Sequence, residues 1–206
     1  MSKVKSYLSF IKFSHTIFAM PFALIGFFLA IFENTSVIPG WHTKVFPPAF
    51  DWGSLGIKLV LVILCMVFAR SAAMAFNRYL DRQYDAKNPR TAVREIPSGV
   101  ITPKNALAFT IISCLLFIAC TWFINSICFY LSPVALAVVL GYSYTKRFTP
   151  LCHLILGLGL SLAPIGAYLA VTGEFAPLPI LFSIAVIFWV SGFDIIYALQ
   201  DEEFDK

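Results

Sequence analysis

The sequence contains six long apolar segments, and these restrict the possible fold more than any other feature. They span roughly residues 14-32, 54-76, 106-125, 127-145, 151-171 and 178-199. A helix that crosses a lipid bilayer needs about 20 mostly apolar residues, so each segment has the length of one crossing. Membrane strands are shorter and alternate strictly between apolar and polar residues, whereas these runs are continuous. We therefore predict an all-α, polytopic transmembrane helix bundle with six spans.

The composition agrees, because 59% hydrophobic and 13% charged residues are unusual for a soluble domain. A net charge of +4 could indicate nucleic-acid binding, but most of the cations lie at alternate ends of the apolar segments. They are Lys3, Lys5, Lys12, Arg78, Arg82, Lys87, Arg90, Arg94, Lys104, Lys146 and Arg147. The positive-inside rule places such loops in the cytoplasm. We expect an integral protein of the inner (cytoplasmic) membrane with a cytoplasmic N-terminus and no nucleic-acid partner.

The cysteines and the N-terminus exclude two other classes. Five cysteines are scattered through the apolar segments without a Cys-x-x-Cys pair, which argues against a disulfide framework or a zinc site. A basic stretch precedes the first apolar run, but that run is long and lacks a small-residue cleavage site, so we expect a retained span rather than a cleaved signal.

A polar motif follows the second apolar segment. Asn77, Asp81 and Asp85 recur every four residues, so they share one face if the helix continues through them. Arg70 stands two turns earlier, inside the span, where a charge costs about 2.5–3.5 kcal/mol and usually marks a ligand, partner or pathway. Two simpler interpretations stay open: Arg70 snorkels or pairs with an acid, and residues 77-85 form a solvated helix end.

The sixth apolar segment ends in a second acidic motif with the same spacing. Asp194, Tyr197, Asp201 and Asp205 can lie on one helical stripe. A surface acidic tail is the alternative, but the repetition of the pattern weakens it. Since both motifs are expected on the cytoplasmic side, they can converge on one opening. Carboxylate and amide oxygens favour Mg²⁺, whose shell is often completed by substrate phosphates.

Cations suited to those phosphates lie near the two motifs. Residues 86-104 carry four cations, one acid, three prolines and a glycine, which suggests a lid or a phosphate-gripping loop, although membrane topology alone could supply the charges. Tyr142 and Lys146 share a helical face, and interfacial anchoring is their simpler interpretation. A diphosphate neutralised by metal and cations is a good leaving group. With apolar helices behind the site, the implied substrate is an isoprenoid diphosphate.

Three motifs resemble the signature set of the UbiA family of intramembrane aromatic prenyltransferases. They are Asn-x-x-x-Asp-x-x-x-Asp at 77-85, Tyr-x-x-x-Lys at 142-146 and Asp-x-x-Tyr-x-x-x-Asp-x-x-x-Asp at 194-205. The loop at 88-99 also resembles the quinone-biosynthesis branch of that family. The resemblance implies that Asn77, Asp81, Asp85, Asp201 and Asp205 bind magnesium diphosphate. The implied catalytic residues are Asp81, Asp85, Asp194 and Asp201, and the implied substrate contacts are Arg70, Arg94, Tyr142, Lys146 and Tyr197.

The resemblance also implies a reaction. A polyprenyl group would pass from its diphosphate to an aromatic acceptor, such as 4-hydroxybenzoate in ubiquinone synthesis or a related acceptor in menaquinone synthesis. An electron-rich ring would attack the carbocation, and Asp194 is the candidate for removing the ring proton. Members of the family usually have nine spans, so we expect residues 1-206 to form a single prenyltransferase domain that is shortened at its C-terminus.

Other classes fit less well. CDP-alcohol phosphotransferases gather their acids in a run that contains Asp-Gly, and no Asp-Gly occurs in this sequence. Prenylation of a tetrapyrrole, as in haem or chlorophyll synthesis, stays open within the same family. A non-enzymatic transporter or lipid-binding membrane protein is the remaining alternative, and it has no need of both acidic motifs.

Overall fold

The computed structural model describes residues 3–33, 36–37, 44–45 and 51–198. Its helices are α1 (Lys3–Phe10), α2 (Phe13–Glu33), α3 (Trp52–Asp85), α4 (Pro103–Ile124), α5 (Ser126–Thr145), α6 (Cys152–Thr172) and α7 (Pro177–Ala198). Two short strands, β1 (Ser36–Val37) and β2 (Lys44–Val45), pair antiparallel between α2 and α3. Within these residues, six helices, α2 to α7, are long and apolar enough to cross a membrane. This confirms the predicted all-α bundle and its six spans.

Local capping signals set several helix ends. The Asp51 side chain accepts hydrogen bonds from the backbone N–H groups of Gly53 and Ser54 at the start of α3. Thr102 caps α4 immediately before Pro103, which tolerates the first helical position because it has no N–H to leave unpaired. Asn125 ends α4 and caps α5, so those two helices form a tight hairpin.

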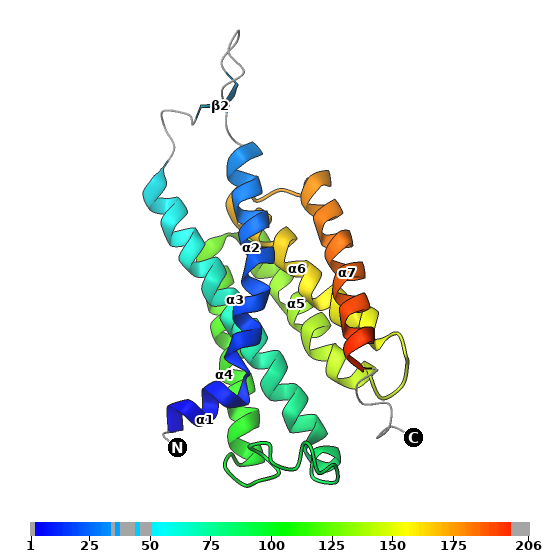
Figure 1. Ribbon diagram of the computed structural model, residues 1–206. Coiled ribbons are helices and arrows are strands. Elements are labelled where there is room, and N and C mark those ends of the chain that lie inside the picture. Colours follow the sequence, from blue (N-terminus) through cyan, green and yellow to red (C-terminus); the bar gives the residue numbers. More distant parts are fainter. Residues whose placement is uncertain (1–2, 34–35, 38–43, 46–50, 199–206) are drawn as a thin grey trace.

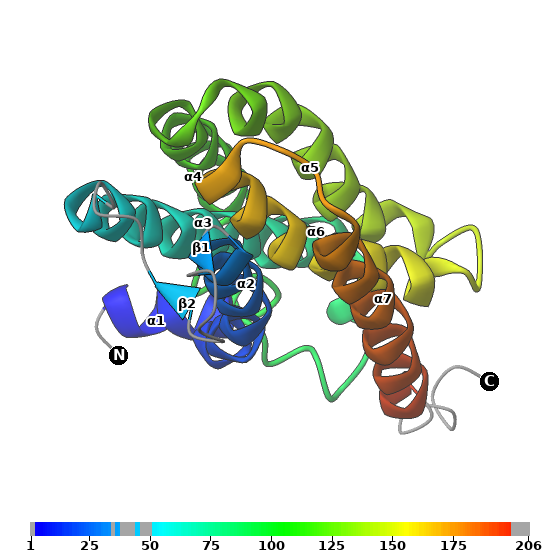
Figure 2. The same ribbon diagram turned by 90° about the horizontal axis from the view of Figure 1, so that it is seen from above.

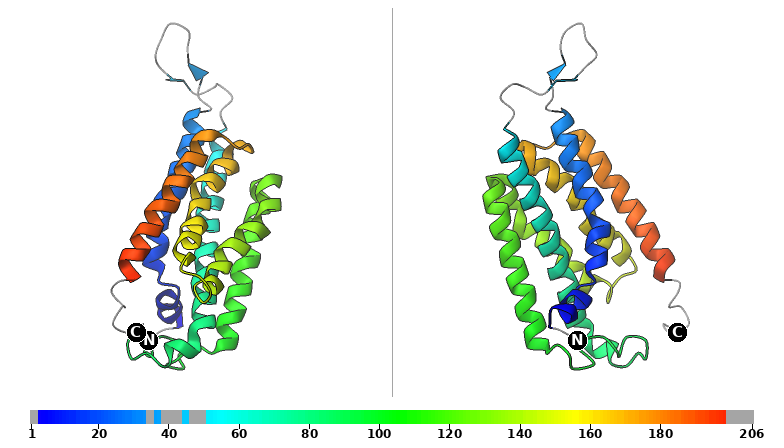
Figure 3. Two further views of the ribbon diagram at one scale, coloured as in Figure 1. Left: turned by 90° about the vertical axis from the view of Figure 1, so that its right-hand side faces the viewer. Right: turned by 60° about the vertical axis from the view of Figure 1, so that its left-hand side comes forward.

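The helices form a bundle in which α6 packs against α7, α2 and α5, while α3 packs against α4 (Figures 1 and 2). α1, the segment 86–102 and the last turns of α3, α5 and α7 lie at one end of the bundle (Figures 1 and 3). The β1–β2 pair lies at the opposite end. The C-terminal ends of α3 and α7, where the polar motifs begin, therefore lie at the same end of the bundle.

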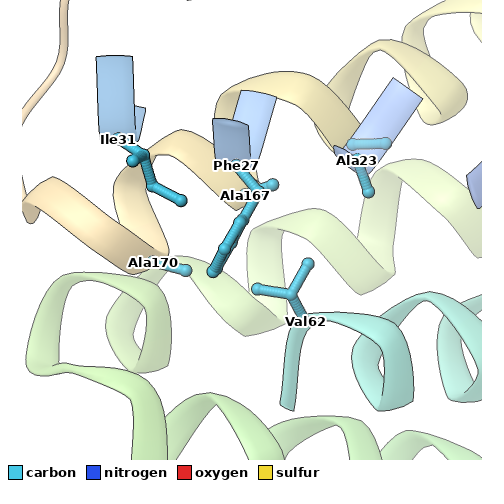
Figure 4. Packing of buried hydrophobic residues seen from close by; sticks show 7 residues of the cluster. Ala23, Phe27, Ile31, Val62, Ala167 and Ala170 are labelled. Atoms are coloured by element: carbon cyan, nitrogen blue, oxygen red, sulfur yellow. The ribbon is translucent and has the colours of Figure 1, made fainter. Parts of the chain in front are cut away.

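Small residues allow α2 and α6 to approach closely. Phe27 of α2 inserts between Ala167 and Ala170 of α6 and Val62 of α3 (Figure 4). A Cβ added to Gly26 would overlap the backbone of Pro164. Close contact through small side chains is the usual way that membrane helices gain packing energy, because lipid supplies no hydrophobic drive between them.

A second apolar cluster fixes the segment 86–102 to the bundle. It is made by Phe10, Ile11, Ala75, Ile96, Ile101 and Ala106. The cluster joins α1, α3 and α4 to the segment, which has turns but no helix or strand. The basic loop is thereby held beside the end of α3 by packing rather than by its charges alone.

All five cysteines lie in the described residues and form no disulfide there. Most of the stretch between the first two apolar segments, residues 33-53, lies outside the described residues.

Candidate functional site

The helix α3 continues through the first acidic motif, as the shared-face interpretation required. Asp81 and Asp85 are buried, with 9% and 7% of their surface exposed. Asn77, Asp81 and Asp85 are each four residues apart, so they follow one another along a single face of the last two turns. Two buried carboxylates need positive partners, since isolated charges are costly to remove from water.

Two cations from the end of α5 meet Asp81. The Lys146 ammonium contacts Oδ2 of Asp81, and Arg147 lies 3.4 Å from Oδ1 while donating to the Leu80 carbonyl at 2.9 Å. The Asn77 amide completes the group in the orientation that satisfies both neighbours. Its nitrogen then donates to Asp81 Oδ2 at 3.0 Å, and its oxygen accepts from Lys146 at 3.2 Å.

Asp85 is held by the basic loop. Arg94 donates to Asp85 Oδ1 at 2.7 Å, and the Thr91 hydroxyl donates to the Asp85 backbone carbonyl at 3.0 Å. Among the described residues, Oδ2 of Asp85 is buried without a hydrogen-bond partner. A buried carboxylate oxygen with an unused lone pair can coordinate a cation or accept a hydrogen bond from a donor.

Further cations lie near Asp81 and Asp85. Arg78 donates to Glu95 Oε2 at 2.8 Å, and the Ser9 hydroxyl donates to the other carboxylate oxygen at 2.6 Å. Burial lowers the pKa of Lys12 from its ordinary value, and the nearby charges of Arg78, Arg94 and Arg90 lower it further. Lys12 lies between α1 and α2, so this helix junction contributes positive charge to the same end of the molecule.

An apolar cavity of about 370 Å³ extends into the bundle from Asn77. Its walls come mainly from α3, α4, α5 and α6, and among its polar lining residues are Arg70, Asn77 and Tyr142. The Nε atom of Arg70 is buried and has no partner among the described residues. The cavity thus combines a hydrocarbon-like interior with a cationic residue, Arg70, among those that line it.

The second acidic motif is described only in part. Asp194 Oδ2 lies 2.8 Å from Nδ1 of His153 on α6. The Tyr197 ring stacks on Phe193, with centroids 6.4 Å apart, and the residue is half exposed, so the structure does not bring it to the Asp81 group. Asp201 and Asp205 lie outside the described residues.

Comparison with known proteins identifies the family. The chain matches the description "UbiA prenyltransferase family" over residues 19–206. It belongs to the UbiA prenyltransferase family. A 4-hydroxybenzoate octaprenyltransferase of Tolumonas auensis is 34% identical over 154 residues, which cover 74% of this chain and 54% of that protein. The corresponding enzyme of Albidiferax ferrireducens is 30% identical over 85% of this chain and 54% of its own length. The chain thus spans about half the length of these curated relatives.

Solved UbiA structures share the fold. The apo structure of a UbiA homologue from Aeropyrum pernix K1 superposes with a TM-score of 0.76 at 32% identity, covering 94% of this chain and 66% of that one. A UbiA homologue from Archaeoglobus fulgidus, bound to GPP and Mg²⁺, superposes with a TM-score of 0.68 at 22% identity, covering 97% of this chain and 65% of the other. The chain is therefore an integral membrane protein of UbiA fold.

The described donor set fits a metal only with help from elsewhere. Within residues 3–33, 36–37, 44–45 and 51–198, no three carboxylate, histidine or cysteine side chains gather closely enough to hold an ion. Mg²⁺, however, is commonly bound through one or two carboxylates plus substrate phosphates. The unpartnered Oδ2 of Asp85 and the hard oxygens of Asn77 and Asp81 suit that mode.

Two contacts of this UbiA site were missed by sequence reasoning. Arg147 adjoins the predicted Tyr-x-x-x-Lys motif and contacts Asp81 beside Lys146. His153 had no motif to mark it, and only the packing of α6 on α7 reveals its contact with Asp194.

Proposed function

We propose that this protein transfers a polyprenyl group from an isoprenoid diphosphate to an aromatic acceptor of the 4-hydroxybenzoate type, in the biosynthesis of ubiquinone or menaquinone. One observation carries the proposal: the acidic face of α3 meets cations from α5 and the basic loop at the polar end of an apolar cavity. Phosphate-binding charge and a hydrocarbon-binding volume thus adjoin, as a prenyl diphosphate requires.

The charges at the site suit an exchange of partners. Lys146 and Arg147 neutralise Asp81, and Arg94 neutralises Asp85. Asp81 and Asp85 would hold the metal of magnesium diphosphate, and Lys146, Arg147 and Arg94 would then bind the phosphate oxygens. Arginine is suited to this role because its planar donors match phosphate geometry. The residues assigned to the metal are Asn77, Asp81, Asp85, Asp201 and Asp205, of which the last two rest on the motif alone.

The reaction begins when the C–O bond of the prenyl diphosphate breaks and its electron pair stays on the diphosphate. Bound Mg²⁺ supplies positive charge that neutralises the leaving diphosphate. Lys146, Arg147 and Arg94 hold the phosphate oxygens. The apolar cavity wall excludes water from the prenyl carbocation that the bond cleavage leaves. Exclusion of water matters because hydrolysis would otherwise compete with attack by the ring.

The acceptor side of the site is assigned to Arg70, Tyr142, Tyr197 and Asp194. Arg70 lines the cavity, and its buried Nε has no partner among the described residues, so its guanidinium suits an anionic group, either the diphosphate or the carboxylate of a hydroxybenzoate. Tyr142 lines the same cavity, whereas Tyr197 is assigned from its motif. Asp194 is assigned as the group that takes the ring proton. The name 4-hydroxybenzoate octaprenyltransferase, borne by relatives that are 30–34% identical, supports this acceptor class.

We also assign the protein to the inner membrane with the site on the cytoplasmic side. The end of the bundle that carries α1, the segment 86–102 and the α5–α6 turn holds most of the cations in the chain. Cytoplasmic loops are enriched in Lys and Arg for topological reasons.

The test measures product formation in membranes that contain the chain, with polyprenyl diphosphate, 4-hydroxybenzoate and either Mg²⁺ or EDTA. Prenylated 4-hydroxybenzoate is expected in the samples with Mg²⁺ and not in those with EDTA. Asp81→Asn is expected to lower turnover by about 100-fold or more, as removal of a charge-stabilising group does.

Asp51→Asn is the matched control, because it changes a carboxylate on the same helix α3 but at the opposite end. Asparagine caps helices about as well as aspartate, so folding and turnover should persist. Absence of product with every aromatic acceptor tried would overturn the proposal. If only a tetrapyrrole were prenylated, the acceptor would be a tetrapyrrole and not a compound of the 4-hydroxybenzoate type.

A further inference from the structure

The contact between His153 and Asp194 joins α6 to α7 outside the motif on α3. Nδ1 of His153 and Oδ2 of Asp194 are 2.8 Å apart, and their side chains are 26% and 24% exposed. An ionised carboxylate can only accept hydrogen bonds. When Asp194 accepts this hydrogen bond as a carboxylate, the donor is the Nδ1–H of His153.

The backbone around this pair is held rigidly. A Cβ added to Gly157, one turn along α6 from His153, would stand 2.5 Å from the Ile187 carbonyl oxygen and from Ser191 Oγ. The Ser191 hydroxyl donates to the His153 carbonyl at 3.0 Å. Because the two helices touch through backbone atoms here, the position of the imidazole relative to Asp194 is determined by the fold.

The pair lies close to the cavity wall. Ile155 and Leu156, which follow His153 on α6, line the cavity, as does Tyr142, whereas His153 and Asp194 are not themselves among its lining residues. Asp194 is one of the charged groups near the Tyr142 phenol. The proposed function places the acceptor ring at this wall of the cavity, within the neighbourhood of Asp194.

We propose that His153 is a positioning residue: its Nδ1–H orients the Asp194 carboxylate, so that the other carboxylate oxygen takes the ring proton. This inference rests on the proposed function. In the step concerned, the ring carbon has formed a C–C bond to the prenyl carbon, and the diphosphate holds the electrons of the broken C–O bond. The ring C–H bond then breaks, its electrons restore aromaticity, and its proton goes to Asp194. His153 takes no proton in this step and only holds the hydrogen bond.

Hydrogen-bond strength favours a role for His153 in orienting Asp194 over a purely structural contact between α6 and α7. A hydrogen bond to a charged acceptor is about twice as strong as one between neutral groups, and it is directional. Partners that orient a reacting or ligating group typically contribute about 10- to 100-fold to activity. If the contact served only to join α6 to α7, its loss would alter stability and leave the deprotonation step unchanged.

Two substitutions separate these roles. His153→Gln keeps an N–H donor at the site, whereas His153→Leu fills a similar volume without one. We expect His153→Leu to lower kcat by about 10- to 100-fold with little change in KM for the prenyl diphosphate. His153→Gln should retain most of the wild-type kcat.

The decisive measurement compares 4-hydroxybenzoate with its ring-deuterated form. When Asp194 is correctly oriented, loss of the ring proton is fast, so deuterium should not slow the wild-type protein. In His153→Leu this step becomes slow, and deuterium should lower turnover. His153→Gln should remain insensitive to deuterium.

Normal kcat in His153→Leu would overturn the inference. Equal losses in both variants, with lower melting temperatures and no isotope effect, would show a purely structural contact and would also overturn it. In either case the wild-type protein still makes product, so the proposed function stands. Absence of product from the wild-type protein with every aromatic acceptor would instead refute the proposed function.

Discussion

Lys12 is positioned where its charge is unfavourable for folding. Burial and the charges of Arg78, Arg94 and Arg90 lower its pKa below the ordinary 10.5. The unfolded chain therefore binds this proton more tightly than the folded one, and stability rises with pH between the lowered pKa and 10.5. A cluster of like charges raises the local concentration of oppositely charged ligands, so this helix junction suits an anion.

Replacing the lysine tests this directly. Lys12→Met keeps the aliphatic stem and removes the charge, so it should melt at a higher temperature than the wild-type protein at neutral pH. The difference should shrink as the pH approaches 10.5, and prenyl diphosphate should bind more weakly. Thermal melting in detergent from neutral to alkaline pH measures the first effect. A variant that melts lower at neutral pH would contradict the assigned repulsion.

The ion pair between Arg78 and Glu95 should contribute to stability through its burial. Their side chains are 8% and 13% exposed, and removing one partner of a buried pair costs about 3–5 kcal/mol. We expect Arg78→Leu to destabilise strongly, and the double variant with Glu95→Leu to recover much of the loss. Arg82→Leu is the control, because Arg82 bonds only the Tyr79 carbonyl and ring among the contacts described for it. Equal melting shifts for the two arginine variants would refute the assignment.

At the scale of elements, the close approach of α2 to α6 depends on one missing side chain. A Cβ at Gly26 would overlap the Pro164 backbone, which cannot move as a flexible side chain can. Gly26→Ala should therefore destabilise by about 1–3 kcal/mol or more. Gly166→Ala on α6 meets open space and should be neutral or slightly stabilising, since alanine is the better helix former. Comparison of melting temperatures decides, and equal values would mean that the helices can separate at no cost.

Elements were predictable from sequence because their signals are local. Apolar length predicted each span, and the caps at Thr102 and Asn125 show that helix ends are also set by neighbouring residues in the sequence. The extension of α3 to Asp85 was left conditional, since charged residues at 77–85 suit either a helix or a solvated end. The structure shows the helix, which ends before Pro89.

Contacts between distant elements were beyond local signals. Lys146 and Arg147 reach Asp81 because the end of α5 lies beside the end of α3, and neither spacing nor charge specifies that neighbour. The same is true of His153, whose partner depends on the tight passage of Gly157 past α7. The sequence could propose that acidic motifs converge, but the cation that meets each carboxylate follows from helix packing.

At the scale of the whole molecule, the bundle separates two environments. The end with α1, the segment 86–102 and the α5–α6 turn (Figure 1) carries most of the cations in the chain. The interior between α3 and α6 holds the apolar cavity. A substrate with a charged head and a hydrocarbon tail can span this boundary. The length of prenyl chain that the protein accepts should then depend on the volume of the cavity.

Filling the cavity should therefore change which prenyl diphosphate is used. Ala135 of α5 lines the cavity, so Ala135→Phe should reduce turnover of long polyprenyl diphosphates while sparing dimethylallyl diphosphate. Ala119→Phe is the control, because Ala119 lies exposed on α4 and does not line the cavity. The ratio of kcat/KM for the long and short substrates measures the effect independently of expression or partial unfolding. An unchanged ratio in Ala135→Phe would mean that the prenyl tail leaves the site by another route, across the lipid-facing surface of the bundle.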